Sequence, residues 1–364
     1  MRVHLVDPAA FTPPYDHALS AALAAAGADV TLVTGPFAHG AAPRMGGYAV
    51  EERFYRWSPG GRGRRAARLA QHVPDMLRYR RAVARAGVDV VHFQWLPAQP
   101  VDVHLLPGVR PRVLTAHDVL PREPRPGQLD AQRRLYERMD GVVVHSEHGR
   151  GRLVDTLGVD PAKVEVIAHG AFDHLTQLPE ATPLPTELAA VDKPVVLLFG
   201  LLRPYKGLDV LLEAWRGIED AELWVVGRPF GVELPADPPP GVRFIPRFVA
   251  DTEIPALFRR ADLVVLPYRE IDQSGVLFTA LAFGKPLVLS DVGGFPEVAA
   301  HGAAELVPPG DAAALHTTLA EVLHDPDRRA RLAEASTRAA GEHYAWDRIA
   351  ENHLAFYERL RAAV

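Results

Sequence analysis

The chain has 364 residues, of which 48% are hydrophobic and 23% are charged, and its formal net charge is −5 at pH 7. This composition is typical of a folded globular protein and excludes a disordered chain, while the negative charge argues against a general nucleic-acid binder. Cysteine does not occur, which excludes disulfides, thiol nucleophiles and thiolate metal sites.

The chain begins with a short apolar run that predicts a strand at residues 3–6. Residues 1–7 reach Pro8 too early for a signal peptide, and no later stretch approaches the roughly 20 apolar residues of a spanning helix. We therefore expect a cytoplasmic protein.

The first half alternates β-rich apolar runs with stretches of helical length, which predicts a parallel sheet covered by helices. After the first strand, the predicted strands are residues 30–33, 88–93, 113–116, 142–145 and 164–168. Residues 179–192 are rich in proline and acidic residues and predict a linker.

The same rhythm resumes after the linker, with predicted strands at residues 195–199, 223–226, 242–245, 263–266 and 287–289. We therefore predict an α/β protein with two doubly wound, Rossmann-like domains that face a central cleft. The first domain is expected over residues 1–178 and the second over residues 193–343, followed by a terminal helix over residues 344–364. Ligands of such sheets bind beyond the carboxyl ends of the strands.

Positive charge is concentrated in residues 62–85. It indicates either attraction for an anionic partner or a solvated arginine-rich helix, and both interpretations stay open. The arginines are Arg62, Arg64, Arg65, Arg68, Arg78, Arg80, Arg81 and Arg85.

A basic loop follows the first strand of the second half. The strand ends at Gly200, and Arg203 and Lys206 precede a predicted helix over residues 208–215. Two cations beside a helix N-terminus predict a site for an anion such as a diphosphate. A surface salt bridge is the alternative.

Two further glycine-bearing loops follow later strands and belong at the same edge of the sheet. In one, Ser274 suits a helix start and Gly275 allows close approach to a ligand. In the other, Gly293 and Gly294 precede Glu297, whose alternative role is to complement a helix N-terminus. Together the three loops favour a phosphate-binding site.

The order and spacing of these motifs resemble glycosyltransferase family 4 over essentially the whole chain. The resemblance also rests on Gly207, a Gly284-Lys285-Pro286 turn, the His117-Asp118 loop and a Tyr344-x-Trp346-x-x-Ile349 helix start. It implies a GT-B fold with an acceptor-binding first domain, a nucleotide-sugar-binding second domain and a last helix that crosses back to the first. It further implies a retaining hexosyltransferase that uses a UDP-, GDP- or similar sugar and needs neither a metal nor another cofactor.

The resemblance also implies residue roles. Arg203 and Lys206 are expected to neutralise the donor diphosphate as it leaves. His117 is expected to act near the anomeric carbon, with a structural histidine in a capped loop as the alternative. The other expected donor-binding residues are Gly200, Asp272, Gln273, Ser274, Gly275, Val276, Thr279, Gly293, Gly294 and Glu297.

The chain departs from the family pattern at two positions, because Ile271 and Thr279 occupy the places of two glutamates. Asp272 and Gln273 are then assigned to donor-sugar hydroxyls, and Thr279 to a weaker ribose contact. This departure leaves open a catalytically silent nucleotide-sugar-binding homologue. An epimerase or hydrolase on the same fold is the other alternative, although an epimerase needs acid–base pairs around the donor sugar, which Ile271 and Thr279 disfavour.

The acceptor side is assigned to the strand ends of the first domain. Many relatives have a glycine pair where this chain has Asp16 and His17, which are expected to contact the acceptor or assist proton transfer. The acceptor hydroxyl is unidentified and belongs to a glycan, a glycolipid or a secondary-metabolite precursor. The arginine segment suggests an anionic or lipid-linked acceptor and peripheral contact with the inner membrane face. The residues assigned here are Tyr15, Asp16, His17, His92, Gln94, Trp95 and Asp118, with packing as the alternative for Trp95.

Two clusters imitate other sites. Asp325-Pro326-Asp327 resembles a metal-binding Asp-x-Asp, but an aspartate followed by proline predicts a helix N-cap. Residues 145–148 resemble a catalytic or zinc cluster, yet they predict a helix-start turn. We predict no metal ligand.

Overall fold

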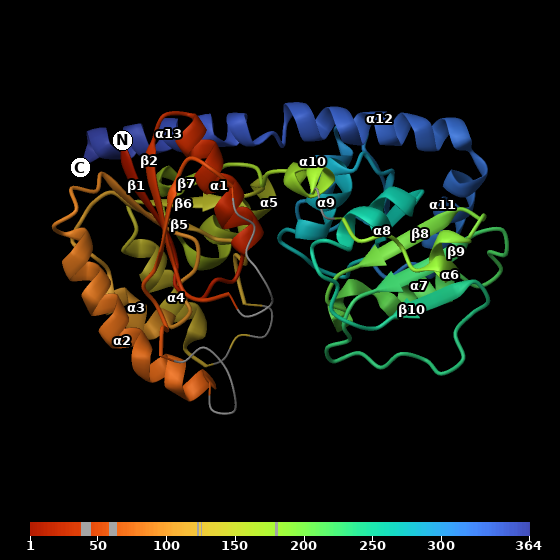
Figure 1. The fold of residues 1–364 in the computed structure, drawn as a ribbon, viewed down its shortest axis with the longest axis horizontal. Helices are drawn as coiled ribbons and strands as arrows, with labels where there is room; N and C mark the ends of the chain where they lie inside the picture. Colours follow the sequence, from red (N-terminus) through yellow and green to blue (C-terminus); the bar gives the residue numbers. More distant parts are fainter. Residues whose placement is uncertain (38–44, 58–63, 122–123, 125, 179–180) are drawn as a thin grey trace. The chain divides into compact units, whose positions relative to one another are not determined.

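The computed structural model describes residues 1–37, 45–57, 64–121, 124, 126–178 and 181–364 (Figure 1), without the side chains of Arg64 and Arg65. The chain divides into two compact units. Unit 1 contains Met1–Gly170 and Ala345–Val364, and unit 2 contains Ala171–Tyr344.

The division falls earlier than the linker expected from the sequence. Residues 171–178 pack with unit 2, since Ala171 N–H donates to the Tyr344 carbonyl (2.8 Å) and Phe172 N–H to the Phe278 carbonyl (3.3 Å). Residues 179 and 180 of the expected linker lie outside the described residues. Residues 181–192 contact unit 2, where Thr182 N–H donates to the Thr252 carbonyl (2.7 Å).

Unit 1 is built on a parallel sheet of seven strands in the order β3-β2-β1-β4-β5-β6-β7. Its strands are β1 (Arg2–Asp7), β2 (Asp29–Thr34), β3 (Ala49–Glu52), β4 (Val90–Phe93), β5 (Arg112–Thr115), β6 (Gly141–Val144) and β7 (Val164–Val166). Its helices are α1 (Pro13–Ala25), α2 (Arg64–Val83), α3 (Gln99–Leu105), α4 (Gln128–Glu137), α5 (Glu147–Gly151) and α13 (Trp346–Ala363), with short helical turns η1 (Arg152–Thr156) and η2 (Pro161–Lys163).

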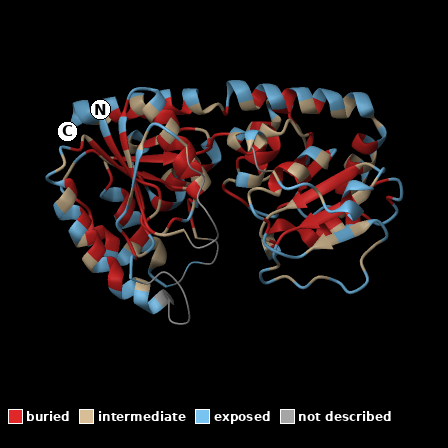
Figure 2. Cartoon of the chain, viewed as in Figure 1, coloured by how far each residue is buried: buried red, intermediate tan, exposed pale blue. Residues whose placement is uncertain are grey.

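Helices cover this sheet because successive strand side chains point to opposite faces and both faces are apolar. Val91 and Phe93 join the core formed with α2, α3 and α4. The alternate residue His92 instead meets Tyr357 of α13, which packs beside α1. Figure 2 shows the resulting buried sheet.

Unit 2 is built on a parallel sheet of six strands in the order β10-β9-β8-β11-β12-β13. Its strands are β8 (Val195–Phe199), β9 (Glu222–Val226), β10 (Val242–Ile245), β11 (Leu263–Leu266), β12 (Leu287–Ser290) and β13 (Ala304–Val307). Its helices are α6 (Thr186–Ala189), α7 (Leu208–Ala214), α8 (Ile254–Arg260), α9 (Gly275–Ala282), α10 (Phe295–Ala299), α11 (Ala312–His324) and α12 (Pro326–Glu342), with short turns η3 (Asp173–Gln177) and η4 (Pro204–Lys206).

The predicted α/β class with two doubly wound sheets is confirmed. Two edge strands, β3 and β13, were not expected from the sequence. Each of these strands has only four residues and includes glutamate. Every residue of β3 is exposed or half-exposed. An edge strand covered on fewer sides needs fewer apolar residues, so its sequence signal is weak.

Candidate functional site

The strand order of unit 2 reverses at β8. The chain proceeds from β8 to β9 and β10 on one side, and then returns to β11 on the other side. In an open α/β sheet, this switch point leaves a crevice beyond the carboxyl ends of the strands. The three predicted donor loops follow β8, β11 and β12, and therefore emerge at this edge.

The loop after β8 contains the two predicted cations. Lys206 is buried, its ammonium donates to the Phe199 carbonyl (3.2 Å), and it lies 5.1 Å from the ring centre of Tyr268. The Arg203 guanidinium lies 4.9 Å from the ring centre of the exposed Phe230. The aromatic rings of Phe230 and Tyr268 help to position the two cations.

Gly200 is the first residue of this loop after β8. Its φ is +100°, and a Cβ there would lie 3.0 Å from Lys206 Nζ and 3.2 Å from Val276 Cγ2. The glycine therefore lets the first turn of α9 approach the lysine ammonium closely. The loops after β8 and β11 are thus brought together.

The loop after β11 ends in the predicted helix start. Gly275 is the first residue of α9, and Ser274 is its N-cap residue, although the Ser274 side chain does not form the capping bond. The Thr279 hydroxyl donates to the Gly275 carbonyl within the helix (3.0 Å), so its oxygen can meet a ligand only as an acceptor.

The loop after β12 touches the loop after β11 at one glycine. Gly293 has φ +58°, and a Cβ there would lie 1.8 Å from the Ile271 carbonyl oxygen. Gly294 is the N-cap residue of α10, and Glu297 lies in its first turn, where a carboxylate complements the helix dipole. Burial, with a smaller effect from Glu297, raises the pKa of Tyr344.

The polar side chains that follow Ile271 lie in the same loop cluster. Asp272 is buried, and Gln273 Oε1 accepts a hydrogen bond from Ser274 N–H (3.3 Å). Each predicted donor-side residue of unit 2 therefore lies on one of three neighbouring loops or on the helices that they begin.

In unit 1, His117 follows the carboxyl end of β5. Its Nε2 lies 3.0 Å from Gln94 Oε1, and its Nδ1 lies 3.2 Å from His145 Nε2. Trp95 stacks on the imidazole at 5.2 Å with a 14° interplanar angle. Burial, with a smaller effect from neighbouring histidines, holds the pKa of His117 well below its usual range. Asp118, the next residue, is exposed.

Histidines follow three consecutive strands of this sheet, and the sequence-based site included only the first. His117 follows β5, His145 follows β6 and His169 follows β7. The signal was present in the sequence, because the ends of neighbouring parallel strands meet at one edge. The local sequence around His145 predicts only a helix-start turn.

Tyr15 of α1 lies at the centre of this cluster. Its ring contacts those of His117 (4.8 Å), His145 (5.4 Å) and His169 (4.8 Å), and also that of Trp346 (5.3 Å) in α13. Tyr15 therefore packs against the edge that carries the histidines.

Two buried carboxyl groups meet where β1 enters α1. Burial raises the pKa of Asp7, but Asp7 accepts hydrogen bonds from the backbone N–H groups of Ala9 (3.1 Å) and Phe11 (2.5 Å), which favour its ionised form over that of Asp16. Burial and the neighbouring Asp7 raise the pKa of Asp16 well above its usual range, which keeps Asp16 protonated.

Asp16 and its neighbour His17 also line a cavity of about 610 Å³ at the ends of β1 and β2. His17 Nδ1 lies 2.5 Å from the Tyr48 hydroxyl on the cavity wall. Leu32, Phe37 and Val50 supply apolar walls, so the cavity combines polar and apolar lining.

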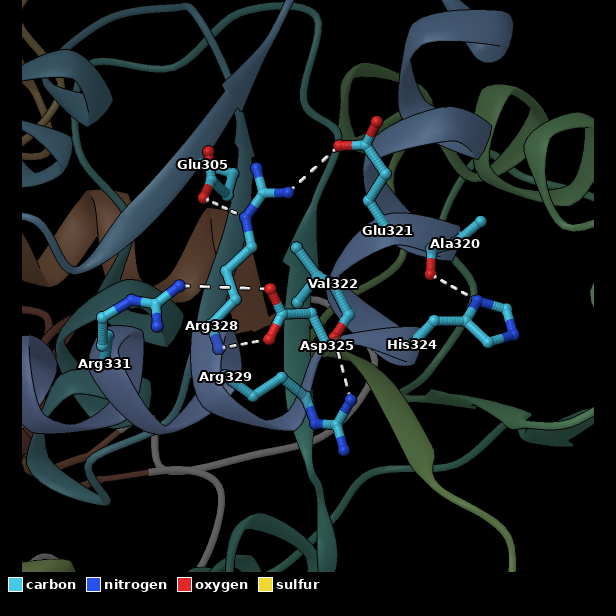
Figure 3. A network of polar contacts seen from close by, with 9 residues as sticks. All are labelled: Glu305, Ala320, Glu321, Val322, His324, Asp325, Arg328, Arg329 and Arg331. Carbon is cyan, nitrogen blue, oxygen red and sulfur yellow. Dashed lines mark hydrogen bonds and ion pairs between the residues drawn. The ribbon is translucent and has the colours of Figure 1, made fainter.

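The imitation metal motif is a helix cap, as predicted. Asp325 accepts a hydrogen bond from Arg328 N–H (2.8 Å) and begins α12. Figure 3 shows this cap within a network in which Arg328 also reaches Glu305 and Glu321. Ser146 likewise caps α5 by accepting from Gly149 N–H (3.0 Å), which confirms the predicted helix-start turn.

The arginine segment forms most of α2. Arg62 lies outside the described residues. Arg78, Arg80 and Arg81 are exposed on this helix. Among the described residues, no helix combines the length and apolar character needed to cross a membrane.

Two family descriptions match the chain without overlap. Residues 15–171 match "Glycosyltransferase Family 4", and residues 193–325 match "Glycosyl transferases group 1".

Curated relatives carry glycosyltransferase names. The D-inositol 3-phosphate glycosyltransferase of Salinispora tropica is 29% identical over 308 residues, which cover 76% of this chain and 60% of the relative. The phosphatidyl-myo-inositol mannosyltransferase of Mycobacterium leprae is 32% identical over 232 residues, which cover 61% of this chain and 60% of the relative. The chain thus spans less than two thirds of each of these relatives.

Solved structures share the fold. Sucrose-phosphate synthase from Thermosynechococcus elongatus has a TM-score of 0.77 at 20% identity, covering 100% of both chains. Anabaena Alr3699/HepE in complex with UDP and glucose has a TM-score of 0.74 at 20% identity, covering 99% of this chain and 100% of that chain. The shared architecture is the GT-B fold of two Rossmann-like domains.

Proposed function

The chain belongs to glycosyltransferase family 4, and on this premise we propose that it transfers a hexose from a nucleotide-diphosphate sugar to an acceptor hydroxyl, with retention of configuration. The observation that carries the proposal is the convergence of three loops at the switch point of unit 2. There Gly200 lies beside both Lys206 and Val276, and Gly293 lies against Ile271.

The proposed chemistry follows from the charge that the reaction creates. Cleavage of the bond between the sugar and the diphosphate leaves negative charge on the departing oxygen. Arg203 and Lys206 would stabilise that charge from positions fixed before the reaction, in place of a metal ion. The structural neighbour from Anabaena was solved with UDP, and a relative from Xanthomonas campestris is named for GDP-mannose, so both nucleotides are candidates.

We assign His117 to the reacting sugar. It is half-buried, and its ring plane is held between Trp95 and Tyr15. A neutral imidazole held in this way can exchange a hydrogen bond with a sugar hydroxyl.

We assign the acceptor to the cavity of unit 1. Its polar groups, including His17 and Tyr48, suit a polyhydroxylated molecule, and its apolar wall suits a sugar face or a lipid-linked group. Named relatives act on D-inositol 3-phosphate or on phosphatidyl-myo-inositol, which supports an anionic or lipid-linked acceptor. In this assignment Asp16 lines the cavity in its protonated form, so it does not act as the base that deprotonates the acceptor.

Peripheral membrane contact through α2 is part of the proposal. Trp57 is 74% exposed and Leu69 is 61% exposed, close in sequence to the arginines. Apolar side chains beside basic ones are typical of helices that lie on anionic membranes.

A vesicle sedimentation assay tests this contact. We expect the fraction of protein that sediments with vesicles of anionic lipid to fall in the Trp57→Ser/Leu69→Ser variant and at high salt. Binding that ignores both changes would contradict this contact.

Donor binding is tested by thermal shift against UDP, GDP, ADP and dTDP sugars. We expect one nucleotide class to raise the Tm of the wild type, and Arg203→Ala/Lys206→Ala to lose the shift. The matched control is Lys193→Ala/Arg216→Ala, which removes the same charge from elsewhere in unit 2. An equal shift in both double variants would contradict the assigned diphosphate site.

A catalytically silent homologue is the second candidate, favoured by Ile271 and Thr279 in place of two glutamates. It predicts donor binding without release of nucleoside diphosphate in the presence of a cell-extract acceptor pool. Release of nucleoside diphosphate that depends on the acceptor pool supports the transferase. Release without any acceptor indicates a hydrolase.

A further inference from the structure

Two histidines connect the edge of the sheet to a backbone carbonyl. His117 Nδ1 lies 3.2 Å from His145 Nε2, and His145 Nδ1 lies 3.0 Å from the Ile167 carbonyl oxygen. Burial lowers the pKa of His117 well below its usual range and the pKa of His145 to about 4. Each imidazole is therefore neutral near pH 7 and carries one N–H.

The carbonyl decides which nitrogen of each ring carries that proton. A carbonyl oxygen only accepts, so His145 must carry its proton on Nδ1 and present a lone pair on Nε2. That lone pair needs a donor, and His117 Nδ1 is the atom opposite it. His117 is then protonated on Nδ1, and its Nε2 has the lone pair.

We propose that His145 is a positioning residue that holds His117 in the Nδ1–H tautomer, so that His117 Nε2 accepts a hydrogen bond from a substrate hydroxyl. The substrate part of this statement rests on the proposed function, whereas the tautomer does not. The ring plane is already held by Trp95 and Tyr15, so the tautomer is the property that remains to be set.

The contacts on the other side of His117 fit the Nδ1–H tautomer when the Gln94 amide is turned from the orientation in which its Oε1 faces His117 Nε2. A half-turn of the Gln94 amide exchanges its oxygen and nitrogen, which places NH₂ toward His117 Nε2 and oxygen toward His92 Nε2. His92 is then protonated on Nε2, which also meets the Thr115 hydroxyl (2.7 Å). Its Nδ1 accepts from the Tyr357 hydroxyl (2.6 Å), whose pKa burial raises well above the usual range. The Gln94 NH₂ group then occupies the single lone pair of His117 Nε2. A substrate hydroxyl would take the place of Gln94 as the donor to this nitrogen.

The test reads the tautomer directly, by ¹⁵N NMR of the full-length protein with labelled histidine at pH 7.5. We expect His117, identified by its loss in His117→Asn, to be protonated on Nδ1 alone. In His145→Leu this pattern should change to a mixture or to the Nε2–H form. In His145→Gln it should persist, because the amide oxygen can accept from Nδ1–H.

The matched control is His353→Leu, which removes a buried histidine of unit 1 whose ring packs against His92 (5.6 Å between ring centres) but which is hydrogen-bonded within its own helix. Its Nδ1 donates to the Ile349 carbonyl on its own helix (2.8 Å). We expect this variant to leave the His117 signals unchanged. An Nε2–H form of His117 in the wild type, or Nδ1–H signals that survive His145→Leu, would overturn the proposal.

Kinetics separates positioning from general damage to the fold. For the donor that shifts the Tm, kcat should fall at least about tenfold in His145→Leu, since a wrong tautomer removes a correctly oriented group. KM for the donor should stay within about twofold, and His145→Gln should recover most of kcat. Equal loss of kcat in both variants would contradict the role in catalysis. If the tautomer is as expected but no donor is turned over, the proposed function fails and the tautomer assignment stands.

Discussion

At the scale of single residues, Gly293 brings together two of the loops that we propose bind the donor. A side chain there would meet the Ile271 carbonyl, and its φ of +58° disfavours any residue with a Cβ. We expect Gly293→Ala to lower the free energy of unfolding by about 2 kcal/mol and to weaken the nucleotide-sugar shift in Tm. Gly341→Ala is the control, because a Cβ there meets nothing within 4 Å. Equal Tm and donor shifts in the two variants would show that the loops do not depend on this contact.

A second prediction concerns the proton on Asp16. The folded protein keeps this carboxyl protonated up to a raised pKa, whereas the unfolded chain ionises it near 3.9. Its contribution to stability is therefore lost as the pH rises through that window. Asn has an N–H to donate and no proton to lose, so Asp16→Asn should be neutral or stabilising at pH 7.5. Asp16→Ala should be destabilising, and chemical denaturation of both variants tests the difference.

At the scale of an element, α12 begins with a capped turn. Asp325 satisfies the N–H of Arg328, and removal of an N-cap side chain costs about 1 kcal/mol. We expect Asp325→Ala to lower the Tm, and Asp327→Ala to change it less because Asp327 is the second residue of the helix. Added Mg²⁺ or Mn²⁺ should stabilise neither protein. A metal-dependent rise in Tm that Asp325→Ala abolishes would contradict the capping role.

Helix α13 depends on two glycines of unit 1. A Cβ on Gly170 would lie 2.3 Å from the Trp346 ring, and one on Gly141 would lie 2.5 Å from Phe356. We expect Gly170→Ala to destabilise the protein by about 1–3 kcal/mol, because a packed indole cannot move aside at low cost. Thermal unfolding measures the effect, with Gly108→Ala, whose Cβ meets nothing within 4 Å, as the control. An unchanged Tm would show that α13 does not pack tightly at Trp346.

At the scale of the whole molecule, buried neutral histidines make stability depend on pH. Burial lowers the pKa of both His145 and His353 to about 4. The unfolded chain takes up these protons near pH 6.5 and the folded chain only near 4, so stability is lost as the pH falls between these values. Each histidine contributes up to about 1.4 kcal/mol per pH unit. The Asp16 carboxyl has the opposite effect, because its contribution to stability increases as the pH falls.

We therefore expect the Tm to fall between pH 7.5 and pH 5 at constant ionic strength. His353→Leu should fall less steeply than the wild type, because one of the groups is removed. The same slope in the two proteins would show that His353 does not remain neutral in the fold.

The architecture and the positions of the three glycine-bearing loops of unit 2 could be predicted because their signals are local. Apolar strands punctuated by glycine, and cations placed directly after a strand, are visible within a few residues, as at Gly200 and Lys206. The capped turn at Asp325 was visible for the same reason. The short edge strands β3 and β13 were missed because their polar residues leave little hydrophobic pattern.

The roles of the histidines and acids depended on partners that lie far apart in the sequence. His92 is hydrogen-bonded to Tyr357, which is 265 positions away in the sequence. The carbonyl of Ile167 determines which ring nitrogen of His145 carries the proton. By itself, the sequence determined the two doubly wound sheets, the family and the edge of the sheet at which the three glycine-bearing loops gather, because periodicity and turn residues act locally. Only the tertiary structure decided which carboxyl keeps its proton and which imidazole nitrogen carries one, because both depend on burial and on the atoms that the fold brings within hydrogen-bonding distance.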